Sequence, residues 1–147
     1  MRVDLLLAAH AAATFWMTGI IWFAQVVHYP LFADIDGPAF AAYERAHYRR
    51  VVPLAAPLMI AELATGLAIA WRPPAGVAHW QAWLNAALLA LIWISTALVQ
   101  LPAHARLRRC FDPPTHRLLV RSNWIRTIAW TIRSCLILAW MGGAGCA

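Results

Sequence analysis

The chain has no lysine and only six acidic residues, so it lacks the polar surface that a water-soluble domain needs. Charged residues make up 12% of its 147 residues and apolar residues 63%, whereas a soluble domain is about a quarter charged. This composition excludes a soluble globule and a disordered tail. Twelve arginines give a formal net charge of +6, but so apolar a chain is no nucleic-acid-binding module. We therefore expect an integral membrane protein whose main partner is the lipid bilayer.

Cysteine and glycine are also scarce. Cys110, Cys135 and Cys146 form no Cys-x-x-Cys pair, so we expect free thiols and no disulfide framework. Gly19 and Gly66 stand alone in their apolar stretches and form no Gly-x-x-x-Gly association face. The sequence is compatible with a homo-oligomer but does not specify one.

Four apolar stretches are long enough to cross a bilayer, which takes roughly 20 helical residues. They run over about residues 5–29, 51–71, 80–101 and 118–141. The first is too long for the core of a signal peptide, so we interpret it as a retained span. The predicted fold class is all-α, a single integral membrane domain over residues 1–147 that forms a four-transmembrane-helix bundle.

Two connections should have structure of their own. A short amphipathic helix is predicted between spans one and two, over about residues 38–50, with Phe40, Tyr43 and His47 on one face. A turn is predicted at residues 112–115, where two prolines follow Asp112.

The arginines predict the orientation in the membrane. Eight of them lie in or beside the two longer connections: Arg45, Arg49, Arg50, Arg106, Arg108, Arg109, Arg117 and Arg121. The opposite side carries only Arg2 and Arg72. The positive-inside rule then places both connections in the cytoplasm and both termini outside, in a bacterial-type inner (cytoplasmic) membrane.

Polar residues recur at helical spacing inside all four spans, where contact with lipid would be costly. The stripes are His10, Thr14, Thr18, Gln25 and His28; Glu62 and Thr65; Thr96, Gln100 and His104; and Asn123, Arg126, Trp130 and Arg133. We expect them to converge inside the bundle. Glu62 and Arg133 lie near the middle of their spans, so a buried ion pair is predicted, either structural or as the floor of a pocket.

A site is predicted near the cytoplasmic face, where several of these residues reach a similar depth. His10 is too far along its helix from His28 to join it. The candidate catalytic residues are His28, His104, Asn123 and Arg126. The candidate pocket residues are Gln25, Tyr29, Trp93, Gln100, Trp130, Glu62 and Arg133. The other tryptophans, Trp16, Trp22, Trp71, Trp80 and Trp140, are interpreted as lipid-facing or interfacial anchors.

Three chemistries remain open for this site. His28, His47, Glu62 and His104 could bind Fe, Cu or Zn, provided that prolines in span two bend Glu62 towards the histidines. A haem between His28 and His104 is a second option. The third needs no cofactor: a histidine acts as a base and Arg126 stabilises the anion. Glu44 and His47 match the Glu-x-x-His spacing of di-iron bundles, but no second copy exists, so we interpret the match as accidental.

Three strings carry a family resemblance: His28-Tyr29-Pro30, Gln100-Leu101-Pro102-Ala103-His104, and Asn123-x-x-Arg126-Thr127. They resemble the anthrone-oxygenase-like family of small four-helix bacterial integral membrane proteins. His104 is a departure, because many relatives have Asn there, and it marks a distant branch and favours a metal.

The resemblance implies an O2-dependent oxidoreductase that acts on a hydrophobic aromatic or quinone-like substrate. The alternatives are a non-catalytic metal- or haem-binding protein, such as an electron carrier or metal-handling protein, and a purely structural membrane subunit.

Overall fold

The computed structural model describes residues 4–143, so Arg2 and Cys146 lie outside the described residues. The elements in chain order are α1 (Leu5–Phe23), the π-helical turn η1 (Ala24–His28), the 3-10 turn η2 (Pro30–Asp34), α2 (Gly37–Trp71), α3 (His79–Ser95), the π-helical turn η3 (Thr96–Gln100), α4 (Leu101–Leu107) and α5 (Pro113–Gly143). No strand occurs between residues 4 and 143. The all-α prediction is confirmed.

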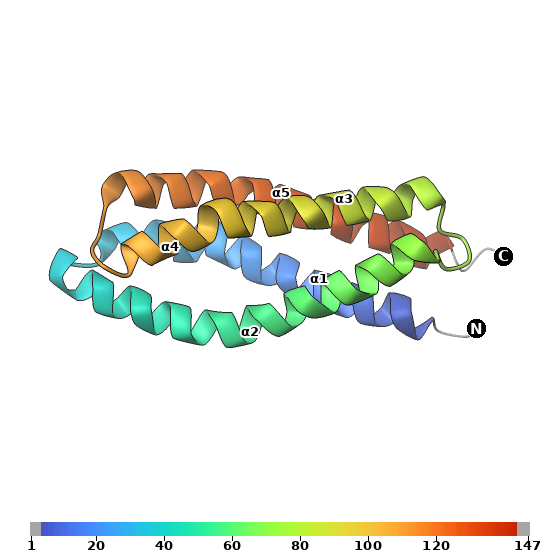
Figure 1. Cartoon of the computed structure of the whole chain (residues 1–147), viewed down its shortest axis with the longest axis horizontal. Coiled ribbons are helices and arrows are strands. Elements are labelled where there is room, and N and C mark those ends of the chain that lie inside the picture. The colour runs from blue at the N-terminus through green and yellow to red at the C-terminus, as the bar shows by residue number, and fades with distance from the viewer. Residues whose placement is uncertain (1–3, 144–147) are drawn as a thin grey trace.

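The elements form long helical arms that run side by side along the molecule (Figure 1). They are α1 with η1, α2, α3 continued by η3 and α4, and α5. We call the end formed by η2, the start of α2, α4 and the start of α5 the basic end, since it carries the arginine-rich connections. The start of α1, the 72–78 connection and the end of α5 meet at the opposite end.

Three arms are long and apolar enough to cross a membrane: Leu5–Asp34, Gly37–Trp71 and His79–Leu107. These helices indicate a membrane protein. Within the described residues α5 is not among them, and it carries Arg117, Arg121, Arg126 and Arg133.

The prediction of a separate amphipathic helix is wrong, because residues 38–50 form the first part of α2. This helix runs without a break for 35 residues and contains Pro53 and Pro57. Proline removes one backbone hydrogen bond and bends a helix when tertiary packing holds both sides, and α2 is bowed in the middle (Figure 1). Phe40 of this segment is fully buried, whereas Tyr43 is partly exposed.

The predicted turn at residues 112–115 is corrected in the same way, because α5 already begins at Pro113. The Asp112 carboxylate accepts a hydrogen bond from the Thr115 backbone N–H at 3.1 Å and another from the Thr115 hydroxyl. These bonds lower the pKa of the Asp112 carboxyl. The cap therefore stabilises the start of α5 above the carboxyl's ordinary pKa and is lost only as the pH falls through the lowered value.

Two π-helical turns lie directly before prolines, at Pro30 and Pro102. A proline ring clashes with the carbonyl four residues earlier, and a π turn is one way in which a helix relieves that clash. In both turns the backbone N–H of the next residue bonds to a carbonyl five residues back, from Tyr29 to Ala24 and from Leu101 to Thr96. Each turn shifts the helical phase and buries a glutamine, Gln25 or Gln100.

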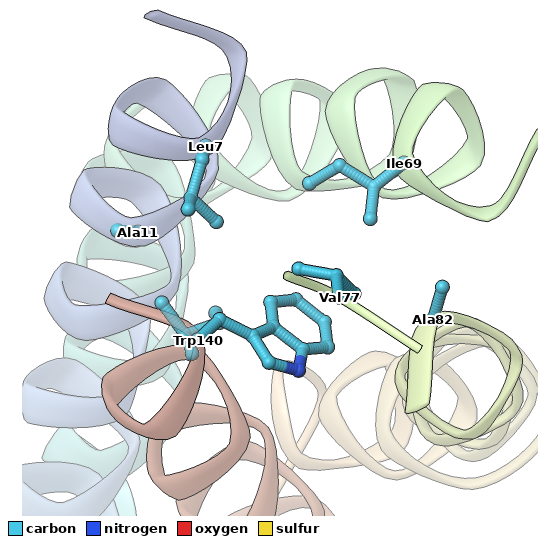
Figure 2. Packing of buried hydrophobic residues seen from close by; sticks show 7 residues of the cluster. Leu7, Ala11, Ile69, Val77, Ala82 and Trp140 are labelled. Atoms are coloured by element: carbon cyan, nitrogen blue, oxygen red, sulfur yellow. The ribbon is translucent and has the colours of Figure 1, made fainter. Parts of the chain in front are cut away.

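Trp140 was predicted to be an interfacial anchor, and this prediction is wrong. Its ring is 3% exposed and packs in a cluster at the end opposite the basic end, with Leu7, Ile69 and Val77 (Figure 2). The indole N–H donates to the Gln81 side chain at 3.2 Å, which removes the need for an interfacial partner. The other four predicted anchors, Trp16, Trp22, Trp71 and Trp80, are exposed.

Gly66 provides a test of the packing between α1, α2 and α3. A Cβ at this position would lie 3.1 Å from Leu89 Cδ2 and 3.2 Å from His10 Cε1. Because hydrogen bonds hold the His10 ring, overpacking of about 1–3 kcal/mol should outweigh the helix-propensity gain of about 1 kcal/mol. We expect Gly66→Ala to lower the midpoint of thermal unfolding in detergent.

Gly19→Ala is the matched control for this change, since nothing lies within 4 Å of its added Cβ. An equal or higher midpoint for Gly66→Ala than for Gly19→Ala would contradict the packing described here.

Candidate functional site

A cluster of histidines and one carboxylate occupies the interior of the basic end. Glu44 of α2 is fully buried and accepts a 2.6 Å hydrogen bond from His104 Nδ1 of α4. The other ring nitrogen of His104 lies 3.3 Å from the Tyr29 hydroxyl. His28 Nε2 and His47 Nδ1 lie 2.8 Å apart. Residues from three arms thus meet at one point, because the π turn η1 brings His28 and Tyr29 inwards.

Glu44, His47 and His104 have the geometry of a metal-binding group. One ligand atom from each lies within 4.8 Å of the other two. Glu44 Oε2 and His47 Nε2 are buried and have no hydrogen-bond partner, which is unusual for buried polar atoms. Two imidazoles and one carboxylate form a ligand set that suits transition metals, iron in particular.

A groove of about 750 Å³ runs between α1 and α2 and reaches this cluster. Its walls are mainly apolar, with Met17, Ile20 and Leu54 among them, and Trp16 and Phe23 at exposed positions. His28, Tyr29, Tyr43, His47, Arg50 and Arg126 supply its polar side chains. The groove therefore combines a hydrophobic channel with a polar, histidine-lined end.

Amides beside the groove tie α5 to the two π turns. The Asn123 side chain donates to Gln25 Oε1 at 2.9 Å, and Gln25 donates to the Val120 carbonyl at 3.2 Å. Gln100 donates to the Ser122 hydroxyl at 2.9 Å. The carbonyl oxygens of the Asn123 and Gln100 side chains have no partner. These contacts fix the position of Arg126, one turn further along α5.

The predicted ion pair between Glu62 and Arg133 is confirmed. Arg133 Nη1 lies 2.6 Å from Glu62 Oε1, and both side chains are fully buried. The Trp130 indole N–H donates to both carboxylate oxygens, at 3.1 and 3.0 Å. Arg133 Nε donates to Asn85 Oδ1 at 3.0 Å. The network joins α2, α3 and α5 and lies in the centre of the bundle.

His10 belongs to the same central network, which also fixes its tautomer. Its Nε2 faces two donors, the Asn85 amide at 3.2 Å and Arg133 Nη2 at 3.4 Å. Nε2 must therefore be the acceptor, so Nδ1 carries the proton and donates to the Thr65 hydroxyl at 2.8 Å. His10 is a neutral bridge between α1, α2 and α3.

The structure brings only some of the predicted site residues together. His28, His47, His104, Tyr29 and Arg126 gather at the basic end. Glu62, predicted as the metal carboxylate, is not brought to these histidines, because Arg133 and Trp130 occupy its oxygens.

Fewer residues line the groove than were predicted for the pocket. Among the described residues, those that line it do not include the predicted pocket residues Gln25, Trp93, Gln100, Trp130, Glu62 or Arg133. Of the predicted catalytic residues, His28 and Arg126 line the groove, whereas His104 and Asn123 do not. Gln25 and Gln100 lie beside it in the amide contacts, and Trp93 packs against the central apolar cluster.

Sequence reasoning missed three residues of these clusters. Glu44 was set aside although the Glu-x-x-His spacing pointed to it. Asn85 is an amide inside an otherwise apolar stretch, and a single polar residue in such a stretch indicates a buried hydrogen bond. His116 of α5 donates from Nε2 to the Tyr29 carbonyl at 2.8 Å and so holds the Tyr29 backbone. No spacing in the sequence signalled His116.

Comparisons with protein-family models, curated proteins and solved structures found no match. The resemblance to the anthrone-oxygenase-like family therefore stays a prediction based on the quoted strings.

Proposed function

We propose that this protein is a metal-dependent membrane oxidoreductase that acts on a hydrophobic aromatic or quinone-like substrate. The observation that carries the proposal is the group of Glu44, His47 and His104, in which Glu44 and His104 are buried and the half-buried His47 lines the polar end of an apolar groove. In this proposal the three side chains hold a transition metal, Fe(II) in preference, through His47 Nε2, His104 Nδ1 and the Glu44 carboxylate.

The surroundings of the three ligands support this assignment. Metal-bound histidines usually donate their other ring N–H to a fixed partner, which sets tautomer and orientation. His47 has such a partner in His28 at 2.8 Å, and His104 has one in Tyr29 at 3.3 Å. The two unpartnered atoms, Glu44 Oε2 and His47 Nε2, are the ones that a metal would satisfy.

The groove suits a flat apolar substrate. A volume of about 750 Å³ falls within the range of small-molecule pockets. Because Trp16 and Phe23 stand at exposed positions on α1, a lipid-soluble molecule would enter sideways from the bilayer. His28 and Tyr29 would position the reacting end of the substrate, and the apolar walls would exclude water. When bound, the metal would supply the activation of O2.

We further propose that α5 is the fourth span, although its arginines lower its hydropathy. Arg126 and Arg133 point inwards and are 7% and 0% exposed, so neither faces lipid. The basic end would lie at the cytoplasmic face of a bacterial-type inner membrane, with both termini outside.

The testing experiment is elemental analysis of detergent-purified protein, followed by O2 consumption with an anthrone or a quinol. We expect about one equivalent of metal per chain and turnover that a chelator abolishes. Metal-free protein that binds no added Fe(II), Cu(II) or Zn(II) would refute the proposal.

A second candidate is oxidation of the substrate by O2 without a cofactor, favoured by the chain of contacts from Glu44 through His104 to Tyr29. In that case Glu44 orients His104, His104 Nε2 takes the proton of the Tyr29 hydroxyl, and Tyr29, which lines the groove, takes a proton from the substrate. Turnover by metal-free protein would favour this candidate. Bound metal without turnover would favour a non-catalytic metal-handling role.

A further inference from the structure

Two arginines are buried two turns apart on α5, and only one has a carboxylate partner. Arg133 pairs with Glu62 at 2.6 Å. Arg126 is 7% exposed, and its Nε has no hydrogen-bond partner. Within residues 4–143 the other ion pair joins Glu44 to His104, so no carboxylate pairs with Arg126. Tyr29 lines the same groove as Arg126, and its hydroxyl lies 3.3 Å from His104 Nε2.

Arg126 also opens into the groove, where it is one of the lining residues. A second arginine, Arg50, lines the same groove at an exposed position. Among the described residues that line it, none is aspartate or glutamate. The polar end of the groove thus carries positive charge without a compensating anion from the chain.

A buried guanidinium without a counter-ion is costly, and planar carboxylates match its donors best. The centroid of the Trp130 ring lies 5.3 Å from the Arg126 guanidinium carbon, and Arg126 itself lines the groove. We infer that Arg126 is an anion-binding residue and that the groove takes an amphipathic organic acid, with its apolar body along α1 and its carboxylate or phenolate at Arg126. This inference rests on the proposed function only in treating the groove as the substrate site.

The test compares two probes of one shape, anthracene-9-carboxylate and the uncharged anthracene-9-methanol. Binding to the protein in phosphatidylcholine nanodiscs is measured by anthracene fluorescence. Because hydrogen bonds to a charged group are stronger than those between neutral groups, we expect the acid to bind at least about tenfold more tightly than the alcohol. Arg126→Gln should abolish this preference, and Arg126→Lys should retain part of it.

Arg121→Gln is the matched control, since Arg121 is exposed on the same helix, and it should leave the preference unchanged. Equal binding of the two probes to the wild type, or a preference that survives in Arg126→Gln, would overturn the inference. If phosphatidylglycerol nanodiscs weaken the binding of the acid to the wild type but not to Arg126→Gln, the site belongs to an anionic lipid headgroup, which would overturn the aromatic acid as its ligand.

The wild-type comparison does not depend on whether a variant folds. Metal content measured on the same samples separates this inference from the proposed function. Protein that binds no added Fe(II), Cu(II) or Zn(II) but still prefers the acid would refute the proposed metal site and support the anion site. Protein that binds metal but shows no preference for the acid would refute the anion site and leave the proposed metal site standing.

Discussion

Glu44→Gln is expected to release a bound transition metal while leaving the helical bundle folded. Glutamine keeps the size of the side chain and an oxygen that can accept from His104 Nδ1, which now lies at 2.6 Å. It removes the negative charge that a divalent cation needs in a fully buried place. Loss of an outer hydrogen-bond partner lowers metal affinity roughly 10- to 100-fold, so loss of a ligand should exceed that.

The measurement is equilibrium dialysis against Fe(II) under anaerobic conditions and against Co(II), whose absorption reports the coordination geometry. His28→Gln should lower the metal affinity by a smaller factor, because His28 contacts His47 but is not one of the three ligands. Asp34→Asn is the control for loss of an exposed carboxylate near the same end. Equal affinity of the wild type and Glu44→Gln would exclude Glu44 as a ligand.

The helical arms and the inward-facing polar stripes were predictable, since both depend on the 3.6-residue period alone. The pairing of Glu62 with Arg133 was predictable for a related reason. A carboxylate and a guanidinium that lie at similar depth in the membrane have no cheaper partners than each other.

The choice of Glu44 over Glu62 at the histidines was not predictable. This choice depends on α2 continuing without a break through residues 50 and 51. It also depends on the π turn η1, which changes the face of the helix on which His28 lies. Both are results of tertiary packing around prolines, which local propensity does not reveal. The entry of His10 into the central network depends in the same way on how neighbouring arms are staggered.

The central network should decide the stability of the bundle. Glu62→Gln leaves Arg133 buried with no counter-ion, and Arg133→Met leaves Glu62 equally uncompensated. Breaking one side of a buried ion pair costs about 3–5 kcal/mol. Each single variant should therefore lower the free energy of unfolding in detergent by roughly that amount. We also expect part of each purified variant to be unfolded.

The double variant Glu62→Gln/Arg133→Met separates charge pairing from packing. It removes both charges and keeps an acceptor for the Trp130 indole, which now donates to Glu62 at 3.0 Å. We expect it to be more stable than either single variant, with a coupling energy of about 1–3 kcal/mol. Strictly additive losses would show that the two groups do not stabilise each other.

The same double variant addresses whether the pair acts in the proposed chemistry. Among the described residues, those that line the groove include neither Glu62 nor Arg133, so the pair should support the bundle without touching the substrate. A folded double variant should then keep its metal and its preference for an acidic ligand. If the double variant folds and retains metal but loses turnover, the ion pair influences the reaction electrostatically. That outcome would contradict a purely structural role.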